Sequence, residues 1–174
     1  IMSGSIADNV GRGSGVIAAA GGGGKILQVL SPTPLTAVQT LSTGTTWVDI
    51  TNLSQAITPS ATTSRILIMY SVFLSTAEDG QTRILRDATA VGVGDARDSR
   101  TRVSREGTNR IQYTGDAHDF SFIDSPSTTS AITYKIQVMP HDSGPHYVNR
   151  CRTDSDSVAN STGCSTMILW EIGA

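Results

Sequence analysis

Residues 65–74, Arg-Ile-Leu-Ile-Met-Tyr-Ser-Val-Phe-Leu, form the most apolar run in the chain and restrict the folds that it can adopt. The run is rich in β-branched and aromatic residues and no N-capping pattern precedes it, so a strand is favoured over a helix. With the two-residue period of a strand, large side chains fall on both faces. The two faces carry Ile66, Ile68, Tyr70, Val72 and Leu74 on one side, and Leu67, Met69 and Phe73 on the other.

A strand that is apolar on both faces needs apolar cover on both faces. We therefore predict that residues 65–74 form a central strand. One face is expected to pack on the core of its own domain and the other on a neighbouring subunit. The chain is accordingly expected to be a homo-oligomer.

The composition favours an all-β protein. Ser and Thr together number 43, whereas aromatic residues make up 5% and charged residues 16% of the chain. Thr suits the exposed face of a strand, and Ser and Gly suit turns. The net charge of -2 gives no electrostatic argument for nucleic acid, and no stretch reaches the roughly 20 apolar residues of a membrane span. We expect neither a nucleic-acid partner nor insertion into a membrane, and the N-terminus lacks the pattern of a secretion signal.

The first 24 residues differ from the rest because glycine is concentrated in 11–15 and 21–24. So much glycine makes ordering of the backbone unfavourable, so residues 1–24 are predicted to be an extended arm or linker, and residues 25–174 the folded domain. Gly24-Lys25 hints at a phosphate-binding loop. The motif fails because Ala19 and Ile26 stand where it needs Gly and Ser or Thr.

Short strand patterns separated by turn residues continue to the C-terminus. Residues 131–138 alternate most regularly, with Ile132, Tyr134, Ile136 and Val138 expected inside. The count of nine or ten strands favours a jelly-roll-like antiparallel β-sandwich over an immunoglobulin domain. The expected strands are 25–30, 45–50, 53–57, 65–74, 82–87, 89–94, 118–123, 131–138, 146–149 and 165–172, with weaker patterns at 36–43, 101–103 and 110–113.

Catalytic and metal-binding patterns are weak. His118 lies beside Asp116 and Asp119, but no serine occupies a Gly-x-Ser-x-Gly turn of the kind that a hydrolase triad uses. His141 and His146 lie five residues apart across a proline-containing turn, which is not a metal-ligand spacing, so we interpret them as solvated loop histidines. We predict a protein that is not an enzyme and has no catalytic residues, bound metal or cofactor, although paired carboxylates for glycoside cleavage have no sequence spacing to test.

Arginine dominates the basic residues, since only Lys25 and Lys135 are lysines. Five of the arginines lie in 95–117, among acidic residues. Arginine forms bidentate pairs with carboxylates and is enriched at interfaces, so we predict subunit-interface ion pairs; an anionic-glycan contact and a solvated loop are the alternatives. The five are Arg97, Arg100, Arg102, Arg105 and Arg110.

The two cysteines, Cys151 and Cys164, lie thirteen positions apart and flank a polar loop between two expected strands. A disulfide between them would stabilise the fold by roughly 3 kcal/mol if the geometry permits. Two free thiols in a protein made in a reducing cytosol are the alternative.

Several strand-and-turn motifs resemble a domain common in tail-fibre and other virion proteins of marine and freshwater bacteriophages. Together they cover most of residues 24–174, although none is a catalytic signature. The motifs are Gly24–Val29, Trp47–Ser54, Ile57–Ser60, Ser64–Ile68, Leu85–Asp87, Gly92–Asp95, Phe120–Pro126, Tyr147–Arg150 and Met167–Ala174.

This resemblance implies a trimeric β-sandwich on the surface of a virion assembled in the bacterial cytoplasm, in contact with other virion proteins. It implies no transferable catalytic residues. We expect a tail-fibre tip domain that binds a host surface glycan or protein through residues 95–117 and 140–147. The alternatives are a capsid decoration protein held by its N-terminal arm and, from a third class, a carbohydrate-processing tail enzyme.

Overall fold

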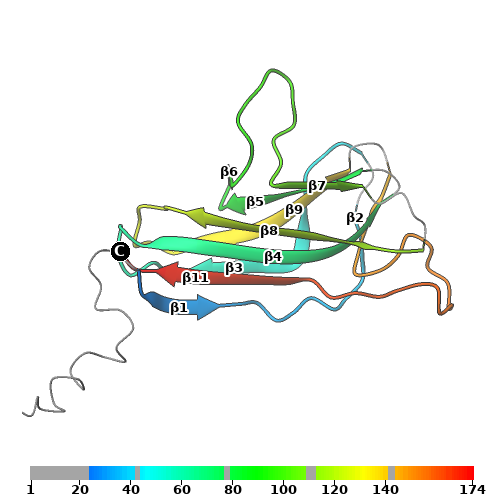
Figure 1. The fold of residues 1–174 in the computed structure, drawn as a ribbon, viewed down its shortest axis with the longest axis horizontal. Coiled ribbons are helices and arrows are strands. Elements are labelled where there is room, and N and C mark those ends of the chain that lie inside the picture. Colours follow the sequence, from blue (N-terminus) through cyan, green and yellow to red (C-terminus); the bar gives the residue numbers. More distant parts are fainter. Residues whose placement is uncertain (1–23, 42–43, 77–78, 109–112, 141–143) are drawn as a thin grey trace, which may run out of the picture.

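The computed structural model describes residues 24–41, 44–76, 79–108, 113–140 and 144–174, and these form a sandwich of two antiparallel sheets (Figure 1). The described residues include strands and turns but no helix. The all-β, jelly-roll-like prediction is therefore confirmed. The predicted arm falls almost wholly on residues 1–23, outside the described residues.

The six-stranded sheet is built around β4, which pairs with β8 along one edge and with β11 and then β10 along the other. β1 and β2 complete the sheet beyond β11 and β10. β11 therefore lies inside the sheet, between β1 and β4. The strands are β1 (Ile26–Leu30), β2 (Gln39–Leu41), β4 (Arg65–Thr76), β8 (Asp116–Asp124), β10 (His146–Val148) and β11 (Thr166–Ile172).

The five-stranded sheet has the order β3-β9-β5-β6, with β7 paired to the other half of the same edge of β5. β5 and β6 form a hairpin joined by Asp87 and Ala88. Asp87 adopts a φ of 52°, a left-handed conformation that aspartate tolerates better than most residues. The strands are β3 (Val48–Ile57), β5 (Asp79–Arg86), β6 (Thr89–Val91), β7 (Arg105–Thr108) and β9 (Ile132–Pro140).

The core lies between the two sheets. The predicted inner face of β4 is confirmed, since its five side chains are at most 4% exposed. The four residues expected inside on β9 are also buried. Burial of each such side chain stabilises the fold by about 1.5–3 kcal/mol, which makes the face between the sheets the main source of stability.

Two strand predictions are wrong. The separate strands expected at 45–50 and 53–57 are one strand, β3, in which a register shift and the positive φ of Asn52 interrupt the alternation. No strand forms at 101–103; the short strand there is β7, which begins at Arg105. Pairing with β5 determines where β7 begins, and the local sequence of residues 101–108 does not show this pairing. The strand expected at 110–113 lies mostly outside the described residues.

Candidate functional site

The outer surface of the six-stranded sheet is apolar over four neighbouring strands. The pairing places Val29, Trp170, Leu67 and Ile123 in one row across β1, β11, β4 and β8. Ile168 and Met69 form a second row, and Ile26 and Ile172 a third. We call this set the apolar face: Ile26, Val29, Leu67, Met69, Ile123, Ile168, Trp170 and Ile172.

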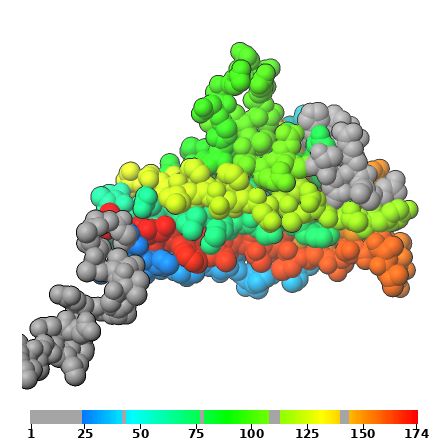
Figure 2. Space-filling model, in the orientation of Figure 1, coloured from blue at the N-terminus to red at the C-terminus, as the bar shows by residue number. Residues whose placement is uncertain are grey.

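No other described segment covers the apolar face, whose strands lie open as adjacent bands in Figure 2. Ile123 is 46% and Val29 55% exposed. Strand and residue spacings give the face an area on the order of 300 Å². An exposed apolar patch of that size is often functional in a soluble protein.

Phe73, which the sequence places on the same face, is covered by its own chain. A Cβ at Gly115 would lie 2.1 Å from the Cε1 atom of Phe73, and a Cβ at Gly163 would lie 2.3 Å from its Cγ atom. Only glycine allows both loops to close on the ring. The open part of the face is therefore the half that contains Leu67 and Met69.

Three of the five predicted arginines lie on the loop between β6 and β7, which projects from the sandwich (Figure 1). Arg97 and Arg100 are exposed. Arg102 donates from Nε to the Gly94 carbonyl, 2.6 Å away. Arg105 is exposed on β7, and Arg110 lies outside the described residues. The ion pairs expected between subunits remain a prediction.

Two histidines are buried at one end of the sandwich. His118 is 0% and His146 1% exposed, so the interpretation of His146 as a solvated loop histidine is wrong. His146 lies on β10, which pairs with β4, and this pairing takes it out of solvent. His141 lies outside the described residues.

The His118 imidazole has no hydrogen-bond partner on either ring nitrogen within the described residues. Burial lowers the pKa of His118 to about 4, against the opposing charge of Asp116, and it also lowers the pKa of His146. Both rings are therefore neutral near pH 7. Asp116 and Asp119 do not form a catalytic arrangement with His118, because the imidazole faces the interior and is closed to substrate.

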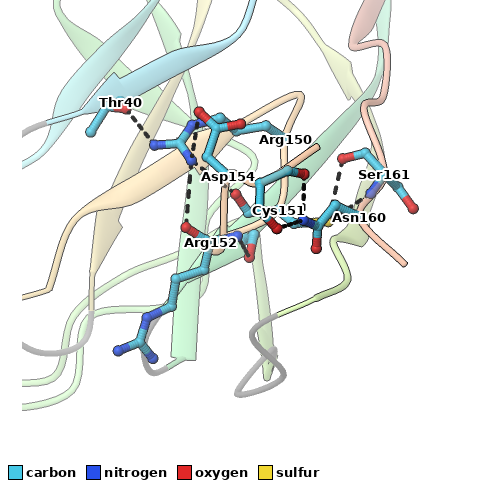
Figure 3. A network of polar contacts seen from close by, with 9 residues as sticks. Thr40, Arg150, Cys151, Arg152, Asp154, Asn160 and Ser161 are labelled. Atoms are coloured by element: carbon cyan, nitrogen blue, oxygen red, sulfur yellow. Dashed lines mark hydrogen bonds and ion pairs between the residues drawn. The ribbon is translucent and has the colours of Figure 1, made fainter. Parts of the chain in front are cut away.

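Arg150 organises the loop between β10 and β11 (Figure 3). Its guanidinium lies 4.2 Å from the ring centroid of Tyr147, and it donates to the carbonyl of Cys151 at 3.1 Å and to Oγ1 of Thr40 at 3.1 Å. The ion pair with Asp154, at 3.5 Å, is a weaker contact. An arginine with this many partners fixes the loop against β2 and β10, which is a structural role.

The two cysteines are free thiols in the structure, the second of the two alternatives that the sequence left open. Cys151 is buried, with its Sγ 2.9 Å from the Tyr113 carbonyl and 3.1 Å from the Ser161 backbone nitrogen. Cys164 is exposed. These contacts hold the Cys151 sulfur in the interior.

We expect one of the two thiols to react with Ellman's reagent in the native protein and both to react in denaturant. Thiolate access controls this reaction, so Cys164 reacts first and Cys151 only after the loop opens. A Cys164→Ser variant should show almost no native reactivity. Zero reactive thiols in the unfolded, unreduced protein would instead show a disulfide.

The outer surface of the five-stranded sheet carries a chain of polar contacts that the sequence does not predict. Arg83 lies 4.2 Å from the ring centroid of Trp47 and donates from Nε to Gln137, 2.8 Å away. Gln137 donates to Asp49 at 2.6 Å, and Asp49 forms an ion pair with Lys135 at 2.7 Å. The sequence shows only that these residues occupy alternating, outward positions of β5 and β9. The register between the strands is what brings them into contact.

In the described part of the chain no group of three or more histidine, cysteine or acidic residues could hold a metal ion. Among the same residues, no helix has the length and apolar character to cross a membrane.

Comparison with known proteins assigns no family to the chain. No family model matches it, and no curated protein does. A match among solved structures is the crystal structure of the infectious bursal disease virus VP2 subviral particle, at 15% identity and a TM-score of 0.33. The match covers 84% of this chain but only 37% of the VP2 chain. A likeness at this score and identity assigns no function.

Proposed function

We propose that this chain is a non-enzymatic structural protein of a virus particle: a homotrimeric tail-fibre tip domain, exposed on the virion, that binds the host surface. The apolar face is the observation that carries the assembly part of this proposal. A sheet with one face in the core and a second apolar face open to water is suited to a permanent oligomer. The resemblance of the sequence motifs to phage virion proteins supports the placement in the particle.

A second copy of the same chain is the partner that fits the apolar face. A stable interface buries about 800 Å² on each partner, with an apolar core and a polar rim, and the face supplies a core of suitable size. Its two ends carry opposite charges. Arg65 lies beside Ile172 at one end, and Asp119 lies beside Ser71 at the other. Each charge can therefore pair with an opposite charge of a second copy at the rim of the interface.

We expect Ile123→Lys and Val29→Lys to dissociate the oligomer into folded monomers of 18.3 kDa. Both side chains are exposed in the single chain, so a lysine there leaves the fold intact but puts a charge in the buried interface. Val158→Lys, at a fully exposed loop position off the face, is the matched control and should leave the oligomer unchanged.

Sedimentation equilibrium measures the outcome. The proposal requires a mass of three chains for the wild type and the control, and of one chain for the two face variants. A wild-type monomer at high concentration would remove the assembly argument. A mass of two chains would keep the face as the interface and replace the trimer with a dimer.

Host binding is proposed for the loop between β6 and β7, because it projects from the body and carries exposed arginines. Immunoelectron microscopy of labelled particles tests the placement. Label at the fibre tips supports the proposal, and label confined to the capsid shell contradicts it.

A capsid decoration protein is the second candidate, favoured by the position at which residues 1–23 join the domain. Gly24 lies against Gly173 and Ile172, so a Cβ at Gly24 would be 2.1 Å from the Gly173 carbonyl oxygen. Gly24, the first described residue, therefore lies beside the apolar face. Deletion of residues 1–23 should release a decoration protein from heads, whereas a fibre tip lacking them should still assemble and bind cells.

A further inference from the structure

A short edge strand connects the projecting loop to a buried histidine. The loop between β6 and β7 runs directly into β7 (Figure 1). β7 pairs with β5 through four residues, and within the described part of the chain no strand pairs with its other edge. β10, the other short strand near His118, is paired on both edges. β7 therefore has the fewest backbone hydrogen bonds to break if this end of the sandwich opens locally.

The backbone of β7 covers the His118 ring. His118 is 0% exposed, and neither ring nitrogen has a hydrogen-bond partner within the described residues. A Cβ at Gly107 of β7 would lie 2.9 Å from Nε2 and 3.0 Å from Cε1, whereas one at Gly80 of β5 would lie 3.4 Å from Cε1. Gly107 thus lies directly over Nε2. An outward movement of β7 is the shortest way to bring water to this nitrogen.

The charges around the ring favour the same movement. Burial opposes a charged imidazole most strongly. Asp116 and Asp119 favour the charged form, whereas Arg105 and His146 oppose it. An imidazolium is therefore attracted by its own strand and repelled by Arg105 of β7. The charged and titratable groups on the adjoining stretches are Asp116 and Asp119 on β8, Asp79 on β5, Arg105 and Glu106 on β7 and His146 on β10, and β4 has none between residues 71 and 76.

We propose that β7 is an acid-sensitive lid, which moves away from β8 when His118 takes a proton from solvent and so releases the base of the projecting loop while the rest of the sandwich stays folded. Water then hydrates the imidazolium. The Asp116 carboxylate lies beside the same position, with Oδ2 3.3 Å from a Cβ at Gly107, and can accept from the ring in the open form. The lid is independent of the proposed function, and only its consequence for host binding rests on that function.

Hydrogen–deuterium exchange of the full chain at pH 7 and pH 5, with labelling times corrected for the intrinsic rates, tests the lid. With a pKa of about 4 in the closed form and 6.5 in the open form, protonation should raise the open population about 20-fold between these pH values. Protection of Arg105–Thr108 should fall by that factor, while β4 stays unexchanged over the same time because it opens only on global unfolding. Unchanged protection of β7, or exchange of β4 together with β7, would overturn the proposal.

His118→Leu should make the protection of β7 independent of pH between 5 and 7. His146→Leu is the matched control: it removes the other buried histidine of this end, whose ring does not lie under Gly107, and should retain the change. Circular dichroism checks that both variants are folded. If His118→Leu does not fold, the wild-type pH profile decides, since one proton taken up per opening gives a tenfold change per pH unit between about 4 and 6.5. A pH effect lost in His146→Leu but kept in His118→Leu would overturn the role of His118.

Cell binding separates the lid from the proposed function. The labelled domain should bind cells less at pH 5 than at pH 7, because a released loop loses its fixed geometry. His118→Leu should bind equally at both pH values. A lid that opens with no change in cell binding refutes the loop as the host contact and leaves the lid standing. A lid that stays closed in the exchange experiment refutes this inference alone.

Discussion

Lowering the pH from 7 to 4 is expected to reduce the free energy of unfolding by about 3 kcal/mol through His118 alone. Its pKa is lowered to about 4 in the folded protein, from 6.5 in an unfolded chain. The unfolded state therefore binds more protons between these two values. The stability contributed by the neutral ring is complete above pH 6.5 and is lost as the pH falls towards 4.

The position of His118 explains the size of this effect. A Cβ at Gly107 would lie 2.9 Å from Nε2 of His118, and one at Gly80 would lie 3.4 Å from Cε1, so the ring packs directly on the facing backbone of β5 and β7. Burial dominates the pKa, while Asp116 and Asp119 favour the proton and Arg105 and His146 oppose it. A cation formed there would have no hydrogen-bond acceptor among the described residues.

His118→Leu should remove most of this pH dependence, because an apolar side chain at the same place does not titrate. Urea denaturation at pH 7, 5.5 and 4 measures it. The buried Glu171 titrates in a separate pH range. Burial raises its pKa, but hydrogen bonds from Ser60 and Gln28 outweigh this effect and lower the pKa to about 2. Its contribution is lost only below about pH 4.5. An equal pH dependence in wild type and His118→Leu would contradict the assignment.

The sequence predicts correctly those strands that have a strong hydrophobic pattern of their own. The run 65–74 carries large side chains on both faces, and 131–138 alternates without interruption, so both were found as β4 and β9. β3 and β7 were misplaced because their positions depend on pairing with β9 and β5. Local propensity is weak where a distant strand sets the register.

The apolar face and the polar surface of the five-stranded sheet also differ in how far the sequence predicts them. The apolar face follows partly from the period-two pattern of one strand, so Leu67 and Met69 were expected to need cover. The polar surface was missed because Trp47 precedes β3 while Arg83 and Gln137 lie on β5 and β9, so the three residues meet only through the register of the sheet. His146 was misjudged for a related reason, since a turn-flanking histidine becomes buried only through the pairing of β10 with β4.

Arg86→Met is expected to destabilise the fold by about 3 kcal/mol, because it leaves a buried carboxylate without its cation. Asp124 of β8 is 7% exposed and accepts from Arg86 Nη1 at 2.8 Å and from the Tyr134 hydroxyl at 2.6 Å. Burial and the Asp124 charge both raise the pKa of Tyr134, so this phenol remains a donor. Arg86 and Tyr134 belong to the five-stranded sheet, and the three residues therefore join the two sheets at one end of the core.

Lys135→Met is the matched control, because it removes an ion pair of similar length, 2.7 Å, in which the side chains are 29% and 47% exposed. Such a surface pair contributes less than about 1 kcal/mol. Urea denaturation at pH 7 should separate the two variants by about 2 kcal/mol, and equal losses would contradict the buried role of Asp124. The double variant Arg86→Met/Asp124→Leu should recover part of the stability of Arg86→Met, since it removes the unpaired charge together with its partner.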